Sequence, residues 1–193
     1  MSSQTFDRLA APWILRRDVE GGFSDHRNDR GGATNFGISI HLMELLPDGN
    51  DDGYLDGDIN KDGVIDIEDI HALDDDRALD IYYRYFWRPN RCEDLPPAVG
   101  LCLFDGLVNH QPNPARRLLQ EGLEVLADGK VGPITIGAAH KISPDYFLPN
   151  YLSHRARFYT DIVRADTSQS TFLRGWLKRM FLLQQFIMKE IKP

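Results

Sequence analysis

Three side chains near the amino terminus have the types and the spacing that acid–base chemistry on a polar substrate requires. Glu20 stands directly before a glycine pair, Asp29 follows nine residues later, and Thr34 follows five residues after that in a second glycine-rich stretch. Two carboxyl groups and a hydroxyl on one cleft edge can protonate a leaving group and place a water molecule for attack. We therefore predict catalytic roles for Glu20, Asp29 and Thr34. Asp25 is a weaker alternative to Asp29.

A helix and a short hairpin are the elements that must position these side chains. Apolar residues at roughly helical spacing predict a helix over residues 5–19, which Gly21 and Gly22 end. Glu20 would then lie at the carboxyl end of this helix, where the macrodipole disfavours a negative charge and favours the protonated acid. Turn residues between short apolar pieces predict a hairpin within residues 23–40.

The rest of the chain is typical of a helical protein. Helical periodicity and proline starts predict further helices over residues 40–46, 67–87, 96–108, a segment opened by Pro114, 133–142, 144–165 and 168–191. The predicted fold class is mainly α, with a small β-hairpin after the catalytic helix and a helical carboxyl-terminal lobe.

An acidic block interrupts this pattern. Residues 44–80 hold 14 Asp/Glu and 2 Lys/Arg. From Asp58 onward, oxygen donors stand at the first, third and fifth positions of an EF-hand loop, and Gly63 stands at the sixth. The sequence therefore predicts a structural calcium ion. Its predicted ligands are Asp58, Asn60, Asp62, the carbonyl of Val64, and Asp69.

A second stretch with similar spacing starts ten residues earlier, at Asp48. It has Ile59 at the twelfth position, where a closing carboxylate would be needed. Whether a second calcium ion binds near Asp48 is therefore left open. The alternative for both stretches is a solvated acidic loop.

Composition and charge narrow the classes of function. The chain has 193 residues and a net charge of −7, but outside the acidic block 20 basic residues face 15 acidic ones. A basic remainder suits an anionic polymer such as nucleic acid or a bacterial wall, and no nucleic-acid motif is present. No membrane-spanning run and no signal peptide are seen. Cys92 and Cys102 are predicted to be buried thiols rather than a disulfide.

The residues from Glu20 to Phe23 and from Asp29 to Ile38 resemble glycoside hydrolase family 108, whose members are peptidoglycan N-acetylmuramidases and include many bacteriophage endolysins. Later segments around Tyr82, Asp105 and Asp128 match as well, and the carboxyl-terminal portion resembles the family's predicted peptidoglycan-binding segment. The acidic block departs from the family pattern, and we interpret it as a calcium-binding insertion.

This resemblance implies a lysozyme-like fold in which Glu20 is the general acid. The bond cleaved would be the β-1,4 bond between N-acetylmuramic acid and N-acetylglucosamine, and the outcome would be cell lysis. The implied organisation is a catalytic lobe over residues 1–92, including the insertion 48–69, and a peptidoglycan-binding-like lobe over residues 93–193, packed as one globule.

The spacing of Glu20, Asp29 and Thr34 also resembles that of lysozymes of the phage T4 type. In those enzymes the Asp and the Thr help to place a water molecule for attack from the opposite face, which implies an inverted product. Asn35, Asp105 and Asn109 are predicted to line the substrate cleft.

Other functions remain open at this point. A lytic transglycosylase would use the same Glu20 without a water-placing partner, and a non-catalytic, calcium-dependent wall-binding module would keep the fold alone. A dockerin-type module is disfavoured because only one loop is complete. We expect a monomer that is made in the host cytoplasm and acts on periplasmic peptidoglycan after release. The bacterial range and the role of calcium in activity or stability are left open.

Overall fold

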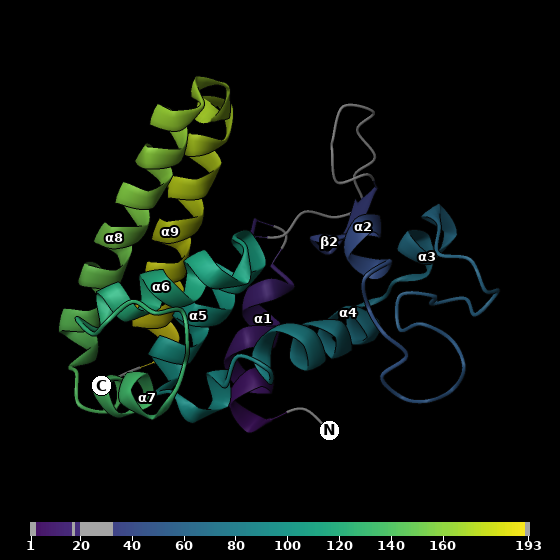
Figure 1. The fold of residues 1–193 in the computed structure, drawn as a ribbon, viewed down its shortest axis with the longest axis horizontal. Helices are drawn as coiled ribbons and strands as arrows, with labels where there is room; N and C mark the ends of the chain where they lie inside the picture. Colours follow the sequence, from purple (N-terminus) through teal and green to yellow (C-terminus); the bar gives the residue numbers. More distant parts are fainter. Residues whose placement is uncertain (1–2, 17, 20–32, 192–193) are drawn as a thin grey trace. The chain divides into compact units, whose positions relative to one another are not determined.

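The computed structural model describes residues 3–16, 18–19 and 33–191 (Figure 1). Over these residues the chain is mainly helical and contains a two-stranded antiparallel sheet, as predicted. Its contacts divide it into two compact units. One is Ala11–Tyr85, and the other is Ser3–Ala10 together with Phe86–Pro193.

The first helical segment is shorter than predicted. The π-helix η1 (Phe6–Ala10) runs directly into α1 (Ala11–Ile14), and the helix ends there instead of at Val19. In sequence, Glu20 follows Ile14 by six positions. The predicted continuation of the helix to Val19 is therefore wrong, while the placement of Glu20 lies outside the described residues and stays a prediction.

The unit Ala11–Tyr85 consists of short elements joined by long loops. After α1 they are β1 (Thr34–Asn35), β2 (Ile38–Ser39), α2 (Ile40–Met43), α3 (Ile67–Ala72), α4 (Asp75–Ile81) and the start of the π-helix η2 (Tyr82–Trp87).

The single helix predicted over residues 67–87 is divided at Asp74. The carboxylate of Asp74 accepts a hydrogen bond from the backbone N–H of Arg77 at 2.8 Å and so starts α4. Asp66 caps α3 in the same way, by accepting from the N–H of Glu68. Aspartate is among the preferred N-cap residues because it satisfies an N–H that has no partner within the helix. Two caps therefore give two helices.

The other unit is a helical bundle. Its elements after η1 and the end of η2 are η3 (Cys92–Asp94), α5 (Pro97–Asn109), α6 (Pro112–Gly122), α7 (Pro133–Ala139), α8 (Pro144–Ala165), η4 (Thr167–Gln169) and α9 (Ser170–Glu190). Helices α5 to α8 all begin with proline, which costs nothing where the N–H has no helical partner. Helices α8 and α9 lie side by side as a long antiparallel pair, and α5 and α6 pack against α8 (Figure 1).

Aromatic rings from distant parts of the sequence form the core of this bundle. Phe6, Trp87 and Phe104 are buried and meet edge to face, with ring centroids 5.5 to 5.9 Å apart. Such edge-to-face packing is favourable beyond the area that it buries. Cys92 and Cys102 are both buried free thiols, as predicted. Within the described residues, no helix combines the length and the apolar character needed to cross a bilayer.

Candidate active site

Thr34 and Asn35 form the first strand of the predicted hairpin. Thr34 pairs with Ser39 and Asn35 pairs with Ile38. The two turn residues, Phe36 and Gly37, have φ angles of 52° and 75°. Positive φ at both positions gives the turn whose twist suits a two-residue hairpin. Thr34 is half-buried, and none of the described residues forms a hydrogen bond with its hydroxyl.

Contacts from later helices fix this hairpin in place. The side-chain amide of Asn35 donates to the carbonyl oxygens of Ile70 at 3.2 Å and Leu73 at 3.3 Å. The hydroxyl of Tyr82 donates to the carbonyl oxygen of Phe36 at 2.7 Å. Both amide hydrogens of Asn35 are thus used within the protein. Its amide oxygen is the group left for a substrate, so the predicted role of Asn35 in substrate binding is narrowed to accepting a hydrogen bond.

The other two predicted catalytic residues, Glu20 and Asp29, lie outside the described residues, as does the alternative Asp25. Their catalytic roles stay predictions. The described chain resumes at Ala33, one residue before Thr34, so the hairpin is the described part of the predicted catalytic segment.

Asp105 is enclosed in the helical bundle. Its side chain is 0% exposed and forms ion pairs with Arg155 of α8 and Arg179 of α9, the latter at 2.7 Å between Oδ1 and Nε. Arg155 is itself fully buried. The adjacent carboxylate raises the pKa of Arg155 against the opposing effect of burial, so this guanidinium stays charged. Asp105 therefore holds three helices together, and its predicted contact with substrate is not needed to explain its presence.

Asn109, the last residue of α5, donates from its amide to the hydroxyl of Tyr159 at 2.7 Å. Tyr159 stacks on Trp176, with ring centroids 5.0 Å apart. His110, which follows Asn109 in the sequence, contacts the rings of Phe158 and Tyr159. Burial, and then the positive charge of Arg155, lower the pKa of His110 to about 3. Asn109 thus positions Tyr159, while its predicted contact with substrate stays a prediction.

Sequence reasoning did not assign roles to Tyr82, Arg155 or Arg179. Tyr82 lies within the helix predicted over residues 67–87, and a buried tyrosine hydroxyl needs a partner. Arg155 stands four residues from Tyr151 and four from Tyr159, so it lies on the buried stripe of α8. A charged residue at that spacing was a signal that a buried carboxylate must lie opposite.

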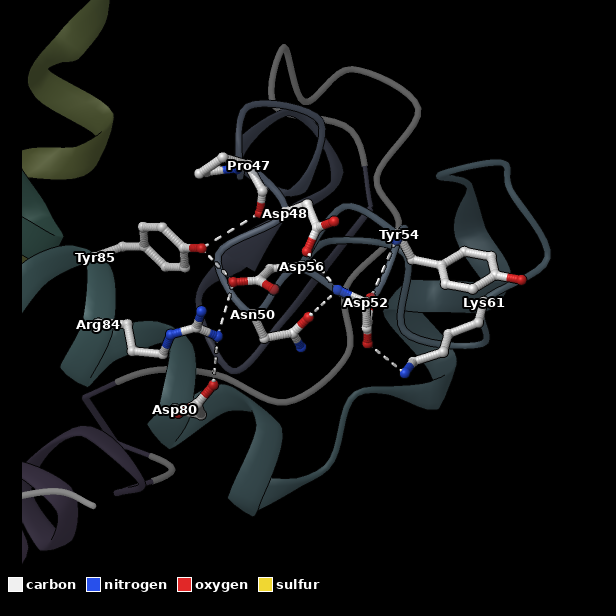
Figure 2. Close-up of polar contacts among 10 residues, drawn as sticks. All are labelled: Pro47, Asp48, Asn50, Asp52, Tyr54, Asp56, Lys61, Asp80, Arg84 and Tyr85. Atoms are coloured by element: carbon white, nitrogen blue, oxygen red, sulfur yellow. Dashed lines mark hydrogen bonds and ion pairs between the residues drawn. The ribbon is translucent and has the colours of Figure 1, made fainter.

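The acidic block folds as two successive loops with the same internal hydrogen bonds. In the second, Asp58 accepts from the N–H groups of Asp62 and Gly63, and Asp62 accepts from Val64. The first repeats these bonds ten residues earlier, with Asp48 accepting from Asp52 (Figure 2) and also from Gly53. The sixth-position glycines have φ angles of 90° and 91°. In both loops this is the sharp turn that an EF-hand loop makes at its glycine.

Asp69 closes the second loop by hydrogen bonding. It is 0% exposed, and its carboxylate accepts from the backbone N–H groups of Ile59, Asn60 and Asp66. Within the described ranges, no three histidine, cysteine, aspartate or glutamate side chains gather closely enough to hold a metal ion. The calcium ligands Asp58, Asn60, Asp62, Val64 and Asp69 stay a prediction.

Charged side chains link the first loop to α4 and η2. Asp56 forms an ion pair with Arg84 at 2.8 Å and accepts a hydrogen bond from Tyr85, while Arg84 also reaches Asp80 (Figure 2). Burial and the hydrogen bond to Asp56 raise the pKa of Tyr85 to about 12. Lys61 of the second loop pairs with Asp52 of the first at 2.6 Å. The loops are therefore neutralised in part by the protein's own cations.

Comparison with known proteins adds the family. Residues 12–110 match the family model described as glycosyl hydrolase 108, and residues 114–181 match one described as a predicted peptidoglycan domain. A solved structure, that of Brucella abortus SagA, is similar in fold with a TM-score of 0.71 and 24% identity, over 95% of this chain and 97% of that one. No curated protein matches the sequence.

The first match spans more than half of the chain and contains the hairpin with Thr34 and its anchor Tyr82. The second covers most of α6 and continues to the middle of α9. Together they join a glycoside hydrolase region to one that binds peptidoglycan. The chain therefore belongs to the glycosyl hydrolase 108 family, and it is a glycoside hydrolase of the lysozyme type that acts on peptidoglycan.

Proposed function

We propose that this enzyme hydrolyses the β-1,4 bond between N-acetylmuramic acid and N-acetylglucosamine, with Glu20 as the general acid. The observation that carries the proposal is the fixed hairpin. It presents Thr34 with a hydroxyl that has no hydrogen-bond partner among the described residues, fourteen positions after Glu20. The contacts from Asn35 and Tyr82 keep this strand in place without using the hydroxyl. A fixed group with an open hydrogen-bonding site is suited to hold a water molecule.

In the proposed reaction, Glu20 donates its proton to the glycosidic oxygen as the bond to the anomeric carbon breaks. A water molecule held by Thr34 and Asp29 attacks that carbon from the opposite face, and Asp29 accepts the proton of the water. One bond is broken, one is formed, and the configuration is inverted. Substrate contacts of Asn35 and of Asn109 are proposed as well, each within its own unit.

A product analysis tests this assignment. Purified peptidoglycan would be digested with the wild type, with Glu20→Gln, and with Glu44→Gln as a carboxylate control from the end of α2. We expect reducing N-acetylmuramic acid ends from the wild type and the control, and none from Glu20→Gln at an unchanged melting temperature. Anhydromuramic ends would identify a lytic transglycosylase instead. Full activity of Glu20→Gln would exclude Glu20 as the acid.

A calcium ion in the loop from Asp58 to Asp69 is the second part of the proposal. Asp58 is 5% exposed and Asp69 is 0% exposed, and no lysine, arginine or histidine among the described residues pairs with either. Two buried carboxylates with no cationic side chain favour binding of a cation. Their hydrogen bonds to backbone N–H groups are compatible with this, because both carboxylate oxygens of Asp58 and Oδ2 of Asp69 each accept one such bond and keep a second lone pair.

The residues that would hold this ion are Asp58, Asn60, Asp62, the carbonyl of Val64, and Asp69; all supply the oxygen ligands that calcium prefers, and binding would have to draw them closer together. We propose a structural role, in which the ion stiffens the insertion between the hairpin and α3. The loop from Asp48 lacks a closing carboxylate, since Ile59 is at its twelfth position, and Asp52 at its fifth position is already paired with Lys61. We therefore propose calcium binding for the second loop alone.

We propose further that the enzyme acts as a phage endolysin does, as a monomer that is made in the host cytoplasm and reaches periplasmic peptidoglycan after release. This proposal is supported by the segment from Glu20 to Ile38, which resembles a family that includes many endolysins. Added to chloroform-treated Gram-negative cells, the protein should clear the suspension, while Glu20→Gln should leave its turbidity unchanged. A lack of clearing by an enzyme that digests purified peptidoglycan would argue against the lytic role.

A further inference from the structure

A groove lies between α6 and α8 in the part of the chain that matches the peptidoglycan domain. It has a volume of about 270 Å³. Its lining comes from one face of each helix, at spacings of three and four residues. The residues from α6 are Asn113, Pro114, Arg117, Leu118 and Glu121, and those from α8 are His154, Arg157, Phe158 and Asp161.

The charges in this groove are distributed unevenly. At one end, Glu121 accepts from Arg157 at 3.0 Å and lies 3.2 Å from Nδ1 of His154. At the other end, Asp161 lies 3.4 Å from Arg164. Arg117 lies four residues before Glu121 on α6. No carboxylate among the described residues pairs with it. Among the residues that the structure describes, the guanidinium of Arg117 therefore has no acidic partner, and it lies in the groove with the apolar surface of Leu118 and Phe158.

We propose that this groove binds the stem peptide of peptidoglycan and that Arg117 pairs with one of its carboxylates. The inference rests on the proposed function only in that peptidoglycan is the substrate. A guanidinium pairs best with a carboxylate, through two parallel hydrogen bonds. The lactyl carboxyl group of muramic acid is consumed where it is joined to the peptide, so the free carboxylates of the polymer lie on the peptide.

The remaining lining suits the other groups of such a peptide. Asp161 lines the groove and can pair with the free ammonium of a diamino acid. An apolar surface for methylene groups is provided by Leu118, Pro114 and Phe158. The volume is slightly below that of typical pockets for drug-sized ligands, about 300–1,000 Å³. It fits one or two amino-acid residues better than a run of several sugars.

The test uses the full chain with the Glu20→Gln substitution, so that binding is measured without cleavage. The probes are the tripeptide L-alanyl-γ-D-glutamyl-diaminopimelate and, separately, a neutral tetrasaccharide of N-acetylglucosamine. Binding is followed by amide chemical shifts in NMR titrations. We expect the tripeptide to shift resonances of α6 and α8. We expect Arg117→Glu to weaken its binding by about tenfold or more, and Arg117→Lys to weaken it less, because the charge remains but the two-bond geometry is lost.

Arg174→Glu is the matched control, since Arg174 is exposed on α9 and does not line the groove. It changes the net charge equally and should leave tripeptide binding unchanged. The proposal is overturned if the tripeptide causes no shifts, if Arg174→Glu weakens binding as much as Arg117→Glu does, or if the tetrasaccharide occupies the groove. Hydrolysis of peptidoglycan by the chain with Glu20 intact is measured separately, so failure of the muramidase assignment is distinguishable from failure of peptide binding.

Discussion

Tyr82 and Phe36 are joined by a hydrogen bond of 2.7 Å from the tyrosine hydroxyl to the phenylalanine carbonyl oxygen. This bond connects the start of η2 with the turn of the hairpin that carries Thr34. Because Tyr82 is 1% exposed, the bond is shielded from water. The position of Thr34 therefore depends on a residue that lies 48 positions later in the sequence.

Replacement of Tyr82 by Phe should lower kcat while changing KM little. The bond fixes the hairpin, and loss of one such bond costs about 1 kcal/mol of stability. Steady-state hydrolysis of soluble peptidoglycan fragments would measure both constants. Tyr54→Phe is the control, since Tyr54 is 39% exposed in the first acidic loop. Unchanged kcat in Tyr82→Phe would show that the hairpin keeps its position without the bond.

Replacement of Thr34 by Val removes the hydroxyl and keeps the shape and strand preference of the side chain. If Thr34 helps to hold the attacking water, kcat should fall by about 10²-fold or more, the usual size of such contributions. Thr34→Ser should retain most of the rate because the hydroxyl remains. Equal rates for the Val and Ser variants would remove Thr34 from the mechanism.

Asp105→Asn should destabilise the helical bundle strongly. The substitution leaves the buried guanidinium of Arg155 without its carboxylate, and breaking such a buried pair typically costs about 3–5 kcal/mol. Urea unfolding followed by circular dichroism would measure the change. Asp161→Asn, in an exposed pair with Arg164, should change the free energy of unfolding by less than about 1 kcal/mol. Similar values for the two variants would contradict the role of Asp105.

The stability of the fold should depend on pH through His110. Its pKa is lowered to about 3, whereas an unfolded histidine titrates near 6.5. Between these values the unfolded chain binds the additional proton, so the free energy of unfolding falls as the pH drops below 6.5. The slope from this group is at most about 1.4 kcal/mol per pH unit. His110→Gln should have a flatter profile than the wild type between pH 6.5 and 4. Parallel profiles would mean that His110 is protonated in the folded protein.

Removal of calcium should lower the melting temperature. A ligand present at about 100 times its dissociation constant stabilises a fold by about 2.7 kcal/mol. EDTA should therefore destabilise the wild type. Asp58→Ala should melt at the lower temperature with or without EDTA, and Asp48→Ala should still respond to EDTA. No effect of EDTA on the wild type would remove the calcium proposal, and loss of the response in Asp48→Ala would indicate that the first loop also binds the ion.

Local features of this protein were predictable from the sequence. Prolines at the starts of α5, α7 and α8 and the turn residues Phe36 and Gly37 act through the backbone of their own neighbourhood, whereas α6 begins at Pro112 and not at the predicted Pro114. The ends of other elements were harder to predict from the sequence. The helix over residues 5–19 stops at Ile14, and that over residues 67–87 is divided by the cap of Asp74. Helical periodicity alone does not report such ends, because the apolar spacing continues past them.

The sequence by itself determined the family, the helical class and the oxygen donors of the two acidic loops, since these depend on residue types at fixed spacing. Only the tertiary structure decided what Asp105, Asn35 and Tyr82 do. Their partners lie 35 to 74 positions away, and hydrogen bonds over such separations follow from packing. Asp105 was predicted to line the substrate cleft, with a solvated residue on a helix as the alternative. It is buried because two arginines from other helices supply the charge that burial requires.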